Sequence, residues 1–157
     1  EIDKQYYSLI KTAIFNHNKY EIEPDLDNHT YLHCQIIRDG DKIDIFNTGL
    51  LESFEAFLDV SQNVLENDMI SDVIFETFMQ QQTILSINRK TDLDRWVSFL
   101  ALVFGLNFTY SFEYVSKHSF LEKLIRRLDY KNPDSKIKMG QIENCCKSFL
   151  KDKVDSI

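Results

Sequence analysis

The sequence predicts a mainly α-helical protein with one β-hairpin in its amino-terminal third. Only 4 of the 157 residues are glycine and 2 are proline, whereas a sandwich or barrel needs such residues at many tight turns. Apolar side chains recur every three or four residues through most of the chain, which is the period of a helix. We therefore expect stacked helical hairpins, arranged as an α-solenoid or a helical bundle.

The length and composition indicate a single domain, residues 1–157. The chain is 43% hydrophobic and includes 12 Phe, which is enough for a packed core. A chain of this length buries roughly two thirds of the surface of its unfolded form. Because it opens with Glu1 rather than Met, we expect it to be a fragment of a longer protein or a processed chain.

The first 50 residues are expected to form a helix followed by the hairpin. Apolar residues recur at helical spacing over residues 2–14, and this first helix is expected to end near Asn16. The hairpin is predicted over residues 31–46, where Asp39-Gly40 lies between two segments rich in β-branched and aromatic residues. A lone hairpin is marginally stable in water, so we expect it to pack against the helices.

Five further helices are predicted after residue 50. The third follows Thr91 and Asp94, whose spacing is typical of a helix start. It is nearly apolar on all sides and is expected to be the central, most buried helix. A turn at Asn132-Pro133 separates the fourth helix from the last, which begins at about Lys136. The apolar stripes cover residues 50–65, 70–85, 96–106, 112–128 and 137–150.

The charge of the chain is unevenly distributed along it. The net charge is −7, with 8 basic and 19 acidic residues before position 116 and 10 basic and 6 acidic residues after it. An acidic body repels phosphates, so general nucleic-acid binding is not expected. The basic end instead predicts a surface for an acidic or phosphorylated segment of another protein. Its candidate partner-binding residues are Lys117, Lys123, Arg126, Arg127 and Lys131.

No pattern in the sequence indicates catalysis, a metal or a cofactor, and we expect a protein that is not an enzyme. The glycines never form a phosphate-binding loop. His29 and His33 have a spacing that allows them to face one side, but Cys34 faces the other side and no carboxylate pair is expected beside them, so an ordinary surface is favoured over a metal site. Cys34 paired with His118 is the alternative of a nucleophilic enzyme, and no further signature supports it.

The stretch from residue 95 to residue 150 resembles an armadillo or HEAT-type repeat segment. It pairs a predicted helix that ends in Leu124-Ile125-x-x-Leu128 with a polar turn and a second amphipathic helix. The resemblance implies an α-solenoid segment that binds partner peptides or domains along a helical face. The hairpin predicted over residues 31–46 departs from this pattern.

A second stretch, residues 93–102, is similar to the central helix of Bcl-2-type bundles. In that family an aromatic residue, a glycine, an arginine and an apolar run line a peptide-binding groove. Arg95 and the apolar run match, whereas Leu93 stands in place of the aromatic residue and Asp94 in place of the glycine. This similarity implies the alternative of a viral-type bundle that binds amphipathic helices and modulates apoptosis or innate immune signalling.

Taken together, these patterns predict a scaffold or adaptor that binds another protein. The sequence holds no run of about 18 apolar residues, so we expect no membrane span. Three cysteines, two of them adjacent, make a poor disulfide framework. An intracellular location, cytoplasmic or nuclear, follows as the expectation.

Overall fold

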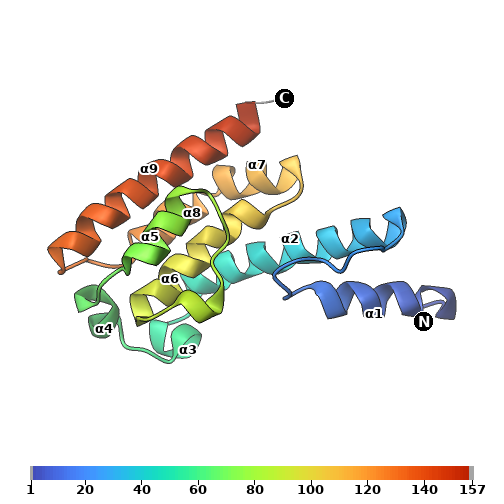
Figure 1. Cartoon of the computed structure of the whole chain (residues 1–157), viewed down its shortest axis with the longest axis horizontal. Helices are drawn as coiled ribbons and strands as arrows, with labels where there is room; N and C mark the ends of the chain where they lie inside the picture. Colours follow the sequence, from blue (N-terminus) through green and yellow to red (C-terminus); the bar gives the residue numbers. More distant parts are fainter. Residues whose placement is uncertain (1, 156–157) are drawn as a thin grey trace.

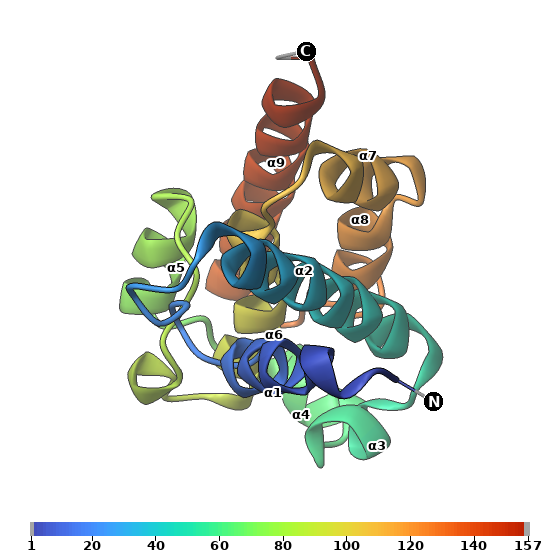
Figure 2. The same ribbon diagram turned by 90° about the vertical axis from the view of Figure 1, so that its right-hand side faces the viewer.

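A computed structural model describes residues 2–155, and all regular structure in this part of the chain is helical (Figures 1 and 2). The mainly helical prediction is therefore confirmed, and the arrangement is consistent with a helical bundle. The α-helices are α1 (Tyr7–Asn16), α2 (Asn28–Leu51), α3 (Phe54–Leu58), α4 (Gln62–Asn67), α5 (Asp72–Met79), α6 (Asp92–Leu100), α7 (Thr109–Lys117), α8 (Phe120–Ile125) and α9 (Pro133–Asp155). Short 3₁₀ turns are η1 (Lys4–Tyr6), η2 (Ser86–Asn88) and η3 (Ala101–Gly105).

Helix α6 lies at the centre of the bundle, as its sequence predicts. Trp96 is 1% exposed, and Val97 and Leu100 are fully buried. The rings of Phe54 and Phe57 pack edge-on against the Trp96 indole with centroids 5.1 and 6.3 Å away. Such aromatic pairs stabilise the core beyond simple area burial. Helices α2, α4 and α5 contact α6 from its sides.

The start of α6 is fixed by the capping box that the sequence indicates. The Thr91 hydroxyl accepts a hydrogen bond from the Asp94 amide, and the Asp94 carboxylate accepts one from the Thr91 amide. The same carboxylate also accepts hydrogen bonds from the amide and hydroxyl of Ser71 and from the Lys90 amide. A fully buried aspartate therefore joins the first turns of α5 and α6.

Helix α9 closes one side of the bundle and crosses α5, α7 and α8 (Figure 1). Its buried face carries Met139, Ile142, Cys146 and Leu150, which follow one another at helical spacing. The helix begins at Pro133, a favourable first position because proline has no amide hydrogen to leave unpaired. The predicted break before the last helix is thus present, but α9 begins at Pro133, before the predicted start at about Lys136.

The predicted fourth helix, residues 112–128, is divided in two. Helix α7 ends at Lys117 and α8 begins at Phe120, with Ser119 between them at φ 51°. A serine in this left-handed region interrupts the hydrogen-bond ladder of a right-handed helix. The central helix is likewise shorter than predicted, because the chain tightens into η3 after Leu100.

The prediction of a β-hairpin over residues 31–46 is wrong. This segment lies inside α2, a continuous helix of 24 residues. Its inward face includes Cys34, Arg38, Lys42 and Phe46, four residues apart in the chain. Charged side chains occupy part of the buried face, so the helical period of apolar residues is hidden. Asp39-Gly40, the expected turn, is helical backbone.

Helices α1 and α2 run parallel and project from the rest of the molecule (Figures 1 and 2). Both begin at the same end, since Ile2 and Tyr6 lie beside His29 and His33. An irregular segment, residues 17–27, returns along the pair. We call residues 2–38 the arm and residues 39–155 the bundle.

Candidate functional site

Two adjacent charged residues of α2 lie at the boundary between the arm and the bundle, and each is bonded within its own region. The guanidinium of Arg38 donates hydrogen bonds to the carbonyl oxygens of Asn16, Lys19 and Tyr20 at and beyond the end of α1. The carboxylate of Asp39 accepts hydrogen bonds from the amides of Asn107 and Phe108, at 2.9 to 3.1 Å, just before α7. Each charge meets the helix end that it stabilises.

The outer face of the arm is rich in exposed apolar side chains. On α1, Tyr7, Lys11 and Phe15 are four residues apart and form one outward stripe with Ile14 beside it. Soluble monomers rarely expose so many neighbouring apolar side chains, and where they do, the surface is usually a site of interaction with another molecule. The exposed apolar residues of the arm are Ile2, Tyr6, Tyr7, Ile14, Phe15, Tyr20, Tyr31, Leu32 and Ile36.

The first part of the arm, residues 4–20, is basic as well as apolar. From Lys4 to Tyr20 the chain carries three lysines and no acidic residue. Lys19 is paired with Glu23 and lies 3.5 Å above the Phe15 ring. For Lys11, no ion pair is found within residues 2–155. Its ammonium is therefore available to a carboxylate from another molecule.

A small apolar pocket lies at the tip of the arm. It has a volume of about 260 Å³ and is lined by Ile2, Tyr6, Leu9, Ile10, His29 and His33. The two imidazole rings meet edge-on with centroids 4.8 Å apart. The tip pocket is large enough to receive one apolar side chain.

The predicted basic surface is only partly available to a partner. Lys117 and Lys123 are exposed at the end of α7 and on α8. Arg126 is also exposed, but its guanidinium is 2.9 Å from Glu143 of α9, which in turn pairs with Lys147. The charge of Arg126 is therefore shared with an acidic neighbour.

Arg127 and Lys131 are both engaged within the molecule. The guanidinium of Arg127 donates hydrogen bonds to the carbonyl oxygens of Gly49 and Glu52 at the end of α2. It also stacks on the Phe54 ring at 4.2 Å. Lys131 pairs with Asp129. Arg127 thus acts on a helix end, and replacing it would disturb the fold as well as any binding.

A second cavity, which we call the cationic cleft, lies where the arm meets the bundle. Its volume is about 310 Å³. Its lining includes the cationic residues Arg38, Lys42 and Arg89. It also includes one acidic residue, Asp41. Ile45, Ile84, Leu85, Phe99 and Leu102 provide apolar walls.

Lys42 is the most unusual ionisable group of this cleft. It is 5% exposed, and its ammonium donates a single hydrogen bond, at 3.2 Å, to the Arg38 carbonyl oxygen. Burial, together with the charge of Arg38, lowers the Lys42 pKa to about 8, although Asp39 and Asp41 oppose the shift. No carboxylate within residues 2–155 pairs with it.

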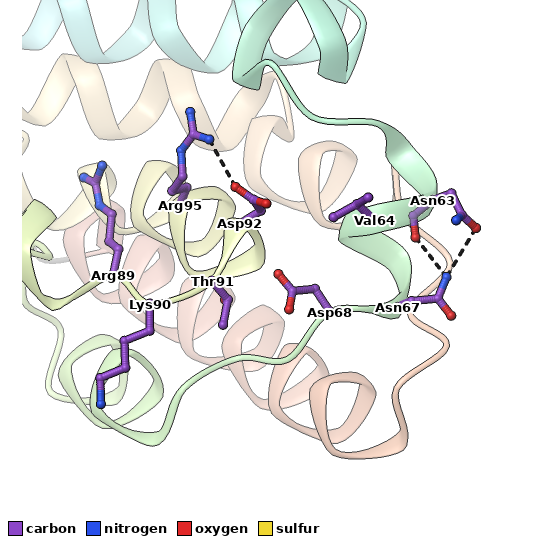
Figure 3. A pocket seen from close by; sticks show the side chains of 9 residues that line it. All are labelled: Asn63, Val64, Asn67, Asp68, Arg89, Lys90, Thr91, Asp92 and Arg95. Atoms are coloured by element: carbon purple, nitrogen blue, oxygen red, sulfur yellow. Dashed lines mark hydrogen bonds and ion pairs between the residues drawn. The ribbon is translucent and has the colours of Figure 1, made fainter.

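Arg89 also faces a third, wider depression beside the start of α6 (Figure 3). In Figure 3 the side chains of Arg89 and Arg95 extend to the same side and Lys90 extends away from them. Burial and the charge of Arg95 lower the Arg89 pKa. Val64 is the apolar member of a lining that is otherwise polar: Asn63, Asn67, Asp68, Arg89, Lys90, Thr91, Asp92 and Arg95.

Cys34 and His118, and the pair His29 and His33, were the residues considered for catalysis and metal binding, and each lies in a separate environment. Cys34 is buried between α1 and α2, and burial raises its thiol pKa. His118 packs against Tyr114 and Phe120 at the other side of α2. Within the described residues, no group of three or more metal ligands comes together around His29 and His33.

The apolar stripe of the arm and the cationic cleft were both missed by sequence reasoning. The apolar spacing of residues 2–14 groups Ile14 with one helix face, but this residue is 55% exposed. The run Ala13-Ile14-Phe15 was an available signal, because three consecutive residues span about 200° of a helix surface and cannot all face one neighbour. Nothing in the residues around Lys42 indicates that this lysine is buried, because the segment has the pattern of a β-strand.

None of the helices in residues 2–155 combines the length and hydrophobicity needed to cross a bilayer. Comparisons with known protein families, curated proteins and solved structures gave no match to this chain. The functional conclusion therefore depends on the geometry described above.

Proposed function

We propose that the chain is a non-catalytic protein-interaction module, a scaffold or adaptor acting in the cytoplasm or nucleus, whose arm binds an acidic amphipathic helix of another protein. The observation that supports this best is the stripe of Tyr7, Lys11, Ile14 and Phe15 on the outside of α1. These residues recur at the spacing by which a helix presents one face. An amphipathic helix laid against such a face is a common mode of recognition.

The acidic character of the partner follows from the charge of residues 4–20, the part of the arm that carries the stripe. Lysines accompany the exposed aromatic residues from Lys4 to Tyr20, with no acidic residue among them. Glutamates beside the apolar positions of a partner would complement these lysines, whereas lysines there would be repelled. A second copy that presents its own α1 would bring these lysines together, so it is a poorer occupant of the stripe than an acidic helix.

The first test measures binding of a defined probe. A fluorescein-labelled helical peptide of leucines and glutamates, with the leucines on one face, is titrated with the protein and followed by anisotropy. The double substitution Tyr7→Ser and Phe15→Ser should weaken binding by at least about tenfold, because each buried aromatic side chain contributes roughly 1.5–3 kcal/mol. Lys11→Glu should weaken it by up to about fivefold, as expected of an exposed ion pair.

Two exposed apolar residues outside the arm provide matched controls. Tyr110 on α7 is 74% exposed and Ile137 on α9 is 64% exposed. Tyr110→Ser and Ile137→Ser should leave the affinity unchanged. Equal binding of a peptide with lysines in place of glutamates, or equal loss in the control variants, would refute the arm as an acidic-helix site. Self-association lost with the Tyr7/Phe15 pair would assign the stripe to a second copy instead.

The basic residues of α7 and α8 are a second candidate surface for the acidic partner. Lys117 and Lys123 are the members best placed to test, because Arg126 and Arg127 have internal contacts. If this surface binds the peptide, Lys117→Glu with Lys123→Glu should reduce the affinity while Lys11→Glu has no effect. The opposite result would favour the arm.

The Bcl-2-like alternative also predicts binding of amphipathic helices, but at α6. The observation in its favour is that α6 is the buried centre of a bundle and carries Arg95 at its start, beside the depression in Figure 3. Peptides of the BH3 type should then bind, and Arg95→Ala should weaken them while Tyr7→Ser and Phe15→Ser do not. The polar lining of this depression makes it the weaker candidate.

A further inference from the structure

We infer that the cationic cleft between the arm and the bundle is a binding site for a small monocarboxylate with an apolar body. The cleft is lined by residues of the segment after α1, by α2, by residues 83–89 and by α6 with η3. Its volume of about 310 Å³ lies at the lower end of the range of ligand pockets, about 300–1,000 Å³. It is separate from the outer stripe of α1.

Unused hydrogen-bond donors in the cleft favour an anion. The Lys42 ammonium has three N–H groups and a single acceptor, the Arg38 carbonyl oxygen. A buried ammonium without a carboxylate partner is costly. The Nε of Arg89 is also buried with no hydrogen-bond partner among residues 2–155. Both residues line this cleft, so a carboxylate bound in it meets unused donors on two sides of the lining.

The packing around Lys42 holds its side chain in place. A Cβ atom at Gly105 would lie 3.1 Å from Lys42 Cε and 3.1 Å from Thr83 Cγ2. Glycine at this position therefore makes room for the lysine stem between η3 and residue 83. A side chain that is ordered in advance loses little entropy when a ligand binds.

The remaining wall determines the rest of the ligand. Ile45, Phe99 and Leu102 provide apolar surface next to the cations. Asp41 in the same wall opposes a second negative charge on the ligand. A monoanion with a small aryl or branched aliphatic body satisfies both conditions better than inorganic phosphate.

Calorimetry with phenylacetate and isovalerate tests the site directly. We expect at least one of them to bind, and phenylacetamide, which lacks the charge, to bind at least about tenfold more weakly. Lys42→Met keeps the apolar stem and removes the ammonium, and it should reduce carboxylate affinity by at least about tenfold. Lys90→Met is the matched control, because Lys90 neighbours Arg89 but points away from it (Figure 3), and it should have no effect.

Amine labelling of the unmodified protein gives a second readout that does not depend on a variant folding. The carboxylate that binds should protect Lys42 from trinitrobenzenesulfonate and leave Lys90 reactive, as located by peptide mass spectrometry. Absence of binding by both carboxylates, equal binding of phenylacetamide, unprotected Lys42, or stronger protection by inorganic phosphate than by the carboxylates would each overturn the assignment.

Discussion

The arm and the bundle are both helical, but they are held together by different forces. In the bundle, apolar side chains from α2 to α9 form one buried cluster around α6, and nine large apolar residues are exposed in residues 39–155, as many as in the much shorter arm. In the arm, polar contacts of Arg38 and Asn16 fix α1 while tyrosines, phenylalanine and isoleucines remain on the outside. An element that is fixed by polar contacts can keep its apolar face for another molecule.

The largest effect is expected from breaking the bundle at Asp94. Asp94→Ala leaves the Ser71, Lys90 and Thr91 amides without their acceptor, and each buried unsatisfied group costs about 1–3 kcal/mol. We expect the free energy of unfolding in urea to fall by roughly 3–4 kcal/mol. Asp92→Ala, in the same helical turn and ion-paired at the surface with Arg95, should cost less than about 1 kcal/mol.

A smaller and local effect is expected in the arm. Arg38→Met removes the donor to three carbonyl oxygens and should destabilise the arm by about 2–3 kcal/mol. Hydrogen exchange should speed up for amides of residues 7–16 and remain slow for those of α6. Lys11→Met is the control on the outer face. Equal acceleration in α6 would show that arm and bundle unfold as one unit.

Replacing Lys42 should stabilise the protein. Its pKa of about 8 lies below the value of 10.5 for an unperturbed lysine, so the unfolded chain binds more protons between these pH values. Wild-type stability should therefore rise across pH 8 to 10.5. Lys42→Met should be more stable by about 1–2 kcal/mol at pH 7, and the difference should shrink towards pH 10. A constant difference from pH 7 to 10 would contradict the lowered pKa.

The smallest effects test whether α2 is as regular a helix as α9. Gly40 and Gly140 each lie inside a helix, and a Cβ atom at either position would meet nothing within 4 Å. Alanine at either should raise the free energy of unfolding by about 0.5–1 kcal/mol. A hairpin turn at Gly40 would make that alanine destabilising. Gly49→Ala is the contrast, since its Cβ would lie 3.1 Å from Leu124 Cδ2, and no gain is expected.

How far the sequence predicts the structure differs between the two regions. In the bundle, apolar residues occupy the buried positions, so the central place of α6, its capping residues and the existence of α9 could be predicted from spacing alone, although not the exact ends of these helices. In α2, the buried positions include Arg38, Asp39 and Lys42, whose partners lie far away in the sequence. Local patterns contain no information on those partners, and they therefore favour a hairpin where the chain forms a helix.

The proposed site on the arm lies away from the basic surface that the sequence predicts. A basic surface for an acidic segment was expected at Lys117 to Lys131, but Arg127 is bound to carbonyl oxygens of α2. Predicting the exposed stripe of α1 requires knowing that, among the described helices, α1 packs mainly on α2. That fact belongs to the tertiary structure, and the aromatic residues themselves fit a buried face equally well.

The sequence order of Arg38 and Asp39 has a consequence for the whole fold. The carboxyl-terminal end of a helix carries a partial negative charge and the amino-terminal end a partial positive one, each of about half an elementary charge. Arg38 faces the former at α1 and Asp39 the latter at α7. The reversed dipeptide would have the same composition and net charge, yet would set both side chains against the wrong poles. The order of two charged residues in the middle of α2 thus helps to fix the directions of α1 and α7.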